Sequence, residues 1–168
     1  MIRPCTNADI LEMFDIINDS ASAYRGVIPA DRWHEPYMPL AELHDEIAAG
    51  VRFIGWEEEG RLLGVMGIQD VKDVTLIRHA YVRTFTRGKG LGGLLLKHLL
   101  AGTERPVLIG TWKAARWAID FYIKNGFEEV DDETKTRLLH CYWTIPERQV
   151  ETSTVLRQSE KLAAETVR

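Results

Sequence analysis

The segment from residue 74 to residue 102 changes character twice, and it constrains the fold more than any other part of the chain. It begins with the β-branched and aromatic run VTLIRHAYV, passes through RGKGLGG, and ends in the leucine-rich run LLLKHLLAG. The first run favours a strand, and the leucine-rich run, closed by Gly102, favours a helix from about residue 90 to 102. The strand-like PVLIGTW follows. A strand, loop, helix and strand in this order predict a crossover between two parallel neighbours, strands 74–82 and 106–111.

The rest of the chain predicts a mixed α/β fold. Three more segments have helical spacing with capping or terminating residues: 8–20, 39–50 and 113–126. Four more segments are predicted as strands, the last two as an antiparallel pair: 51–58, 61–70, 127–130 and 138–145. Residues 146–168 are polar and lack a clear core face, so we interpret them as a tail or loose helix after a single domain spanning residues 1–145.

Composition excludes several classes of protein. At 168 residues the chain has the length of one domain, and its net charge of −4 gives no general attraction to nucleic acid. No stretch approaches the roughly 20 apolar residues of a membrane helix, and the start lacks a signal peptide. Cys5 and Cys141 match no metal-ligand spacing or disulfide framework, so we expect no metal and a cytoplasmic location. The polar end and the predicted strand edges are compatible with a homodimer.

The glycine loop, which we define as residues 87–93 (RGKGLGG), lies in a basic segment although the chain as a whole is acidic. Residues 78–97 contain no Asp or Glu but five cations: Arg78, Arg83, Arg87, Lys89 and Lys97. Such a run is often only a solvated face. Here, however, glycines allow backbone N–H groups to approach a ligand, and the loop leads directly into a helix N-terminus, which favours anions. We therefore expect a phosphate-bearing ligand.

Two other phosphate-binding motifs fit this glycine-rich sequence less well. A P-loop requires Ser or Thr after the lysine, whereas Gly90 follows Lys89. The dinucleotide pattern GxGxxG is present as Gly88, Gly90 and Gly93. The acidic residue that this motif needs about 20 positions later would fall in GTWKAA, which has none. A nicotinamide-dependent oxidoreductase is therefore the weaker reading.

Two motifs resemble the GCN5-related N-acetyltransferase (GNAT) family. Arg87, Gly90 and Gly92 satisfy the pattern R/Q-x-x-G-x-G/A, the form of that family's pyrophosphate arm. Downstream, AIDFYIKNGF at residues 118–127 is similar to the family segment A-I-x-F-Y-x-x-x-G-F. The resemblance covers about residues 1–145. One departure is Ala115, which stands where the family often has an Asn that contacts the cofactor.

The resemblance implies a mostly antiparallel sheet whose central parallel pair splays apart, flanked by helices, with acetyl-CoA as the co-substrate. The arm that would hold the pyrophosphate comprises Arg87, Gly88, Lys89, Gly90, Leu91, Gly92 and Gly93. Backbone groups of Ala80, Tyr81 and Val82 would bind the pantetheine, and an N–H near Val82 would polarise the thioester carbonyl.

The same resemblance implies direct attack by an amine, which requires a base and an acid. Tyr122 occupies the family's tyrosine position and is the candidate acid for the departing thiolate. His79 is the first candidate base, because unperturbed histidine titrates near neutrality. Asp70, Glu35 and a chain of water molecules remain alternatives.

The loop between the first two helices is expected to form the acceptor site. Tyr24 and Trp33 offer rings, Asp31 and Glu35 offer charge for an ammonium group, and the neighbouring His34 and Tyr37 add further rings. We expect an N-acetyltransferase acting on a primary amine of a small molecule or an amino acid, with a faint resemblance to phosphinothricin-type acetyltransferases. A protein N-acetyltransferase and a non-catalytic acyl-CoA-binding protein are the alternatives.

Overall fold

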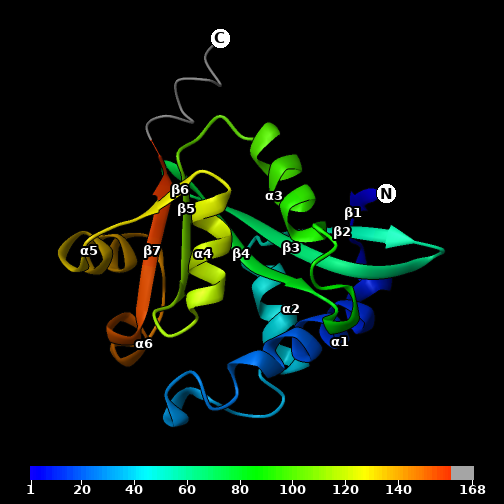
Figure 1. Ribbon diagram of the computed structural model, residues 1–168, viewed down its shortest axis with the longest axis horizontal. Coiled ribbons are helices and arrows are strands. Elements are labelled where there is room, and N and C mark those ends of the chain that lie inside the picture. Colours follow the sequence, from blue (N-terminus) through cyan, green and yellow to red (C-terminus); the bar gives the residue numbers. More distant parts are fainter. Residues whose placement is uncertain (160–168) are drawn as a thin grey trace.

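The computed structural model describes residues 1–159 and contains one seven-stranded sheet in the order β1-β2-β3-β4-β5-β7-β6 (Figure 1). The strands are β1 Ile2–Pro4, β2 Arg52–Glu58, β3 Arg61–Val71, β4 Val74–Val82, β5 Val107–Trp112, β6 Phe127–Glu129 and β7 Ser153–Gln158. The helices are α1 Ile10–Ala21, α2 Leu40–Ala48, α3 Leu91–Ala101, α4 Arg116–Lys124, α5 Asp132–Tyr142 and α6 Glu147–Thr152. Four short 3₁₀ turns join them, including η2 Ser22–Tyr24, η3 Ala30–Arg32 and η4 Thr84–Thr86.

The centre of the sheet contains a parallel pair that separates partway along its length. β4 and β5 are parallel and are paired through Thr75–Val107, Leu76–Leu108 and Ile77–Ile109. The other pairings described in the sheet are antiparallel. Beyond Ile77 the two strands are no longer paired, although β4 continues to Val82 and β5 to Trp112. The predicted α/β fold, with a splayed parallel pair in a mostly antiparallel sheet, is confirmed.

A β-bulge lies where β4 leaves β5. Val65 of β3 is opposite Tyr81, but Gly67 is opposite Arg78, so an extra residue of β4 is accommodated between these pairs. His79 lies in this bulge with a φ of 54°, in the left-handed region that non-glycine residues seldom occupy. Because bulges bend and twist a strand, this one accompanies the departure of β4 from its neighbour.

Helices cover both faces of the sheet, and buried side chains define three clusters beneath them. α3 and α4 pack on one face, where Leu95, Leu96 and Ile119 contact Met66 and Ile77. The opposite face is covered in two places: α1 and α2 lie over β2 and β3, and α5 and α6 lie over β5 and β7 (Figure 1).

The C-terminal part of the sheet differs from the prediction. Residues 138–145, expected as a strand, fall mostly in α5, which Asp131 caps by accepting from Thr134 N at 2.8 Å. The last strand is instead β7, in the region interpreted as a tail or loose helix, and it lies between β5 and β6. The sheet therefore extends past residue 145, and only residues 160–168 of the supposed tail lie outside the described part of the chain. The other predicted helices and strands are present, and β1 was not anticipated.

Candidate active site

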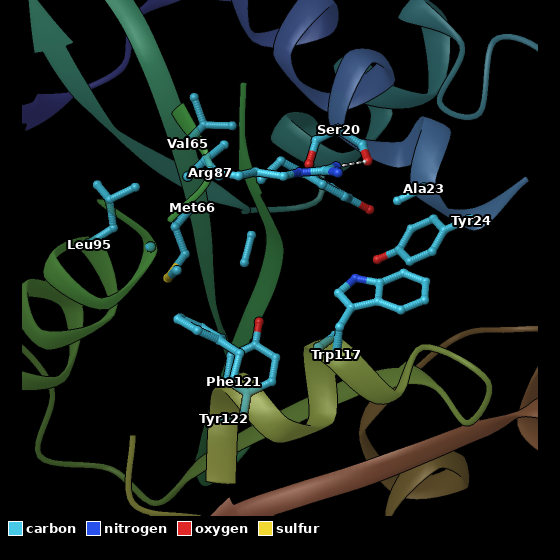
Figure 2. A pocket seen from close by; sticks show the side chains of 15 residues that line it. Ser20, Ala23, Tyr24, Val65, Met66, Arg87, Leu95, Trp117, Phe121 and Tyr122 are labelled. Carbon is cyan, nitrogen blue, oxygen red and sulfur yellow. Dashed lines mark hydrogen bonds between the residues drawn. The ribbon is translucent and has the colours of Figure 1, made fainter. Parts of the chain in front are cut away.

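A cavity of about 440 Å³ opens beside the split, between the N-terminal end of α3 and one side of α4 (Figure 2). Its lining comes from α1 and η2, β3, the free end of β4, the glycine loop, α3 and α4: Ser20, Ala23, Tyr24, Val65, Met66, Ala80, Tyr81, Val82, Arg87, Gly92, Leu95, Trp117, Ala118, Phe121 and Tyr122. Most of these side chains are apolar. This first cavity therefore suits a long, weakly polar chain that reaches the split from the glycine loop.

Two glycines of the glycine loop have a backbone conformation that favours glycine. Gly88 and Gly90 have φ values of 81° and 77°, which disfavour side chains, and their missing Cβ atoms would meet nothing within 4 Å. Among residues 1–159, five consecutive or nearly consecutive N–H groups donate to no hydrogen bond: those of Gly88, Gly90, Leu91, Gly92 and Gly93. Free N–H groups at the start of a helix favour a bound anion.

Gly92 has a packing role in addition. A Cβ atom at this position would lie 3.3 Å from the ring of Phe121, so glycine allows α3 and α4 to approach closely beside the cavity. Gly93 faces the side chain of Asn125, and Leu91 is buried in the core. The arm is thus fixed to the two helices that form the walls of the first cavity.

The two cations of the arm point in different directions. The Arg87 guanidinium lines the first cavity and donates to the carbonyl of Ser20 at 2.9 Å, as the dashed line in Figure 2 shows. Lys89 instead lines a separate polar hollow with Glu12 and Arg83. Of these two cations, Arg87 is therefore the one that lies beside the first cavity.

Tyr122 directs its hydroxyl into the first cavity while its ring packs in the core (Figure 2). The ring makes edge-to-face contacts with Phe121 and Phe127, at centroid distances of 5.0 Å and 6.1 Å. Burial, with a contribution from Tyr24, raises the pKa of Tyr122 above that of an ordinary phenol. The hydroxyl therefore remains a proton donor at neutral and moderately alkaline pH.

The free end of β4 forms one wall of this cavity. Ala80, Tyr81 and Val82 all line it, on the stretch of β4 that has left β5. Because strand pairing with β5 ends at Ile77, backbone groups of this stretch that face β5 have no strand partner in the described sheet. They are available to a ligand that replaces the missing strand.

A second, smaller cavity of about 120 Å³ is formed where the two strands diverge. Its lining comes from η2, the loop before α2, β4, β5 and the α5–α6 region: Tyr24, Tyr37, Ile77, Arg78, His79, Tyr81, Gly110, Thr111, Trp112, Leu139, Trp143, Ile145, Gln149 and Ser153. Tyr24 and Tyr81 line both cavities. The two hollows therefore adjoin at these tyrosines, where the sheet is open.

Aromatic rings form the boundary between the cavities. Tyr24 lies 5.2 Å from Tyr37 and 6.5 Å from Tyr81 between ring centroids, and it stacks on Trp117 at 5.9 Å. Trp112 Nε1 donates to the Tyr37 hydroxyl at 2.7 Å, which fixes that ring. Burial raises the pKa values of Tyr24, Tyr37 and Tyr81, so this boundary stays uncharged.

His79 lines the second cavity and is held by two contacts. Its Nε2 lies 2.7 Å from Glu46 Oε2, and its ring stacks on Phe53 with centroids 6.0 Å apart. Arg78 Nη2 lies 3.0 Å from the same carboxylate oxygen. Burial opposes ionisation of Glu46, but the hydrogen bond with His79 and the charges of His79 and Arg78 together lower the pKa of that carboxyl.

The structure brings two of the six residues predicted for the acceptor site to the cavities. Tyr24 lines both cavities and Tyr37 lines the second, whereas Asp31, Trp33, His34 and Glu35 line neither. Asp31 accepts from Arg148 Nε at 3.0 Å, Glu35 forms an ion pair with Arg25, and Trp33 stacks on Tyr37. The alternative base Asp70 accepts from Thr75 at 2.7 Å and also lines neither cavity.

Some residues in or near the two cavities carried no usable sequence signal. Glu46 is one carboxylate among several on α2, and only the fold places it against His79. Trp117 belongs to the expected helix, but nothing in the sequence indicated its stacking on Tyr24. Ala115, in the position where the family often has Asn, is fully buried against the cluster that contains Ile28 and Trp112.

The split, the arm and the two adjoining cavities together define a two-substrate transferase of the kind that holds its donor through a diphosphate. A profile of the Acetyltransferase (GNAT) domain matches residues 18–140, and the chain therefore belongs to this family. Three predictions are thereby confirmed: the family, an acetyl-CoA-dependent acyltransferase activity, and acetyl-CoA as co-substrate.

Similar proteins agree with the family. The chain is 24% identical to the peptidyl-lysine N-acetyltransferase YiaC of Escherichia coli over 149 residues, which cover 86% of this chain and 97% of the relative. Its fold is similar to that of a PaiA N-acetyltransferase from Thermoplasma acidophilum solved with coenzyme A, with a TM-score of 0.70, 17% identity and coverage of 95% and 98%. A Brucella melitensis GNAT acetyltransferase solved with acetyl-CoA gives a TM-score of 0.58, 20% identity and coverage of 76% and 82%.

No helix among residues 1–159 is both long and apolar enough to cross a membrane. The cytoplasmic location and the homodimer stay predictions.

Proposed function

We propose that this protein transfers the acetyl group of acetyl-CoA to a primary amine of a small molecule. The observation that carries the proposal is the meeting of the two cavities at Tyr24 and Tyr81, beside the free end of β4. A donor in the first cavity and an acceptor in the second would have their reacting groups adjacent without either crossing the sheet.

The donor would enter from the glycine loop. The free N–H groups between Gly88 and Gly93 would bind the pyrophosphate, and the pantetheine would extend along Ala80, Tyr81 and Val82 as a substitute for the missing strand. An N–H near Val82 would donate to the thioester oxygen as negative charge develops there.

The proposed reaction is a direct transfer. The neutral amine attacks the thioester carbon, a C–N bond forms, and the C–S bond breaks to release the CoA thiolate. His79 would accept the proton that the ammonium loses before attack, and Tyr122 would donate its proton to the sulfur. The second proton, which the nitrogen loses as the amide forms, would return to the Tyr122 phenolate. The raised pKa of Tyr122 suits this role, because the phenol is protonated when the thiolate departs.

The dimensions of the second cavity support a small acceptor. Its volume of about 120 Å³ is small beside the roughly 300–1,000 Å³ of ordinary small-molecule pockets. Aromatic rings line much of it, which suits an alkylamine whose cationic end contacts their faces before deprotonation. An amine of a few heavy atoms fits, and so does the end of a longer unbranched chain.

A peptide acceptor is the second candidate, because the relative YiaC is named for acetylation of peptidyl lysine. Only the tip of a lysine side chain would then enter the second cavity, and the peptide would lie outside it. An acyl-CoA-binding protein without turnover is the third reading.

The test is thiol release from acetyl-CoA against a panel of small alkylamines, amino acids, lysine-containing peptides and peptides with free N-termini. The highest kcat/KM is expected among small amines. A clear preference for peptides would replace the acceptor class, and acetyl-CoA binding without turnover of any amine would favour the non-catalytic reading.

A further inference from the structure

Glu46 of α2 and His79 of β4 form a contact that links two separate elements at the second cavity. The pair is largely enclosed, since the side chain of His79 is 15% exposed and that of Glu46 is 19% exposed. We infer that Glu46 is a positioning residue that orients His79 as the base for the acceptor amine, an inference that rests on the proposed function. Carboxylate and imidazole would act as a pair.

The hydrogen bond determines which ring nitrogen is available. Neutral histidine carries one N–H, and an ionised carboxylate only accepts hydrogen bonds. With Glu46 Oε2 at 2.7 Å from Nε2, the ring proton is held on Nε2 and the lone pair is left on Nδ1. Within the described part of the chain Nδ1 has no hydrogen-bond partner, and His79 lines the second cavity. In the inferred arrangement Nδ1 is the atom that accepts the proton from the amine.

The backbone at His79 supports a functional role for this side chain. A φ of 54° is unfavourable for any residue other than glycine, by about 1–2 kcal/mol, yet histidine occupies this bulge. Strained backbone positions of this kind concentrate at functional sites. Stacking on Phe53 and bonding to Glu46 limit the ring to one orientation, as a positioned base requires.

Glu46 is itself held in place from the sheet. Arg78 contacts both of its oxygens through Nη2, at 3.3 Å and 3.0 Å, and donates from Nη1 to Gln69 Oε1 at 3.0 Å. Gln69 Nε2 in turn donates to the carbonyl of Ala49 just after α2. This chain of contacts connects α2 to β3 and β4, so it restrains the position of the Glu46 carboxylate.

Among the charged and titratable groups described around His79, Glu46 is the anion. Arg78 on β4 is the neighbouring cation, and the phenols of Tyr24, Tyr37 and Tyr81 that share the cavity are held uncharged by burial. When Nδ1 takes the proton from the ammonium, the imidazolium that forms is compensated by Glu46. Without this carboxylate the new charge would lie beside Arg78 in a mostly enclosed site, which is unfavourable.

The first experiment needs no knowledge of the acceptor. Nitrogen-15 NMR of the five histidines reports the tautomer of each ring, and a His79→Ala variant assigns the signals of residue 79. The wild type is expected to carry the proton on Nε2. In Glu46→Gln, whose amide both donates and accepts, this preference should be lost. An Nδ1-protonated ring in the wild type, or an unchanged tautomer in the variant, would overturn the inference even if the enzyme is active.

Kinetics provide the second readout. With an alkylamine found active in the panel, Glu46→Gln should lower kcat at least about 10-fold, a fraction of the 10²–10⁴ that general base catalysis supplies. KM for acetyl-CoA and its thermal shift should stay near wild type, which also shows that the variant is folded. The loss should be smaller with trifluoroethylamine, which is neutral at the assay pH and needs less help from a base.

Asp45→Asn is the matched control, because it removes one negative charge from the adjacent, exposed position of α2. It should behave as wild type. Equal activity of Glu46→Gln and wild type would exclude the pair while leaving the proposed function intact. A wild type that turns over no amine would instead remove the proposed function and the catalytic role of the pair.

Discussion

Ile77 of β4 and Ile109 of β5 are the last paired residues of the central parallel strands. Two residues later β4 reaches His79 in the bulge, and β5 continues beside β7 alone. The residues of β4 beyond Ile77 line both cavities. The loss of pairing after Ile77 therefore explains why the two cavities adjoin and share Tyr81.

Gly90→Ala is expected to weaken acetyl-CoA binding by at least about 10-fold, the equivalent of about 1.4 kcal/mol. Gly90 has a φ of 77°, so a side chain there adds backbone strain. The added Cβ atom would also point into the space that the proposed pyrophosphate would occupy. The measurement is the shift in melting temperature with acetyl-CoA, analysed as a function of ligand concentration.

Gly60→Ala separates strain from binding. Gly60 lies in the β2–β3 hairpin with a φ of 76° and nothing within 4 Å of its missing Cβ atom, so it matches Gly90 in conformation and space. Both variants should lose similar stability, on the order of 1–2 kcal/mol. Only Gly90→Ala should lose the ligand-induced shift, and an equal shift in both variants would place the diphosphate elsewhere.

Tyr122→Phe is expected to lower kcat by about 10- to 100-fold, toward the lower end of what a general acid contributes. The affinity for acetyl-CoA should change little, because the ring still packs against Phe121 and Phe127. Since burial raises the pKa of Tyr122, its ionisation should produce no fall in activity between pH 7 and about 10. Steady-state rates across that range test both statements.

Tyr142→Phe provides the corresponding control. This tyrosine donates to Asp73 at 2.7 Å near the other end of the sheet and lines neither cavity. The same atom is removed, so the variant should keep the wild-type kcat. If both tyrosine variants, or neither of them, lost activity, Tyr122 would not be the acid.

The local sequence predicted the elements around the glycine loop well because their signals are short-range. Glycines that adopt positive φ, a helix start after Gly90 and the β-branched run of β4 are all encoded within a few residues. The segment containing Tyr122 was equally predictable, since helical spacing and the Asn125-Gly126 end fix which side of α4 is buried. Local sequence patterns therefore predicted the strand and the helices that line the first cavity.

The C-terminal third was harder because its apolar runs are ambiguous. LLHCYWTI is short and continuously apolar, a pattern that a buried strand and one side of a helix share. The cap at Asp131 decides for a helix, so the role of final strand passes to STVLRQ, which enters between β5 and β6. That insertion depends on contacts far apart in sequence, which no local pattern contains.

The acceptor side is harder to predict for a related reason. Asp31 and Glu35 are charges in the predicted acceptor loop, but each has an arginine partner on the protein. Glu46, which does reach the second cavity through His79, lies on a helix with several similar carboxylates. Charge and proximity in sequence cannot distinguish a paired surface acid from one that a tertiary contact places in a site.

The Asp31–Arg148 pair gives a test of how the acceptor loop is held. Arg148 of α6 donates to both oxygens of Asp31 in η3, at 3.0 Å and 3.3 Å. The pair so joins α6, whose Gln149 lines the second cavity, to the loop that carries Tyr37, which lines it as well. Arg148→Ala should raise KM for the acceptor about threefold, a change within the range of an exposed ion pair, and leave acetyl-CoA binding unchanged.

Exchanging the charges, with Asp31→Arg and Arg148→Asp together, should restore much of the acceptor KM. Arg157→Ala, which removes a comparable surface pair with Glu128 at 2.8 Å, should have no effect on either substrate. A raised acceptor KM in Arg157→Ala would mean that any surface charge acts on the site, and the loop contact would carry no special role.

Asp9 should make the stability of the fold depend on acidic pH. Its carboxylate accepts from both terminal nitrogens of Arg3, at 2.8 Å and 3.0 Å, and from the backbone of Thr6 at 2.7 Å, so it ties β1 to the start of α1. The hydrogen bond from Arg3, with those from Thr6, lowers the pKa of Asp9 to about 2 despite burial. An ordinary Asp has a pKa near 3.9, and each unit of difference is worth about 1.4 kcal/mol.

Because the folded-state pKa is depressed, this stabilisation is complete above the ordinary value and is lost as the pH falls from about 5 toward 2. Urea unfolding at a series of pH values should show a loss of about 2 kcal/mol from this group alone. Asp9→Asn should lower stability at pH 7 by a similar amount and flatten that part of the curve, whereas Asp120→Asn at an exposed position of α4 should not. Parallel pH curves for the wild type and Asp9→Asn would show that another carboxylate controls acid unfolding.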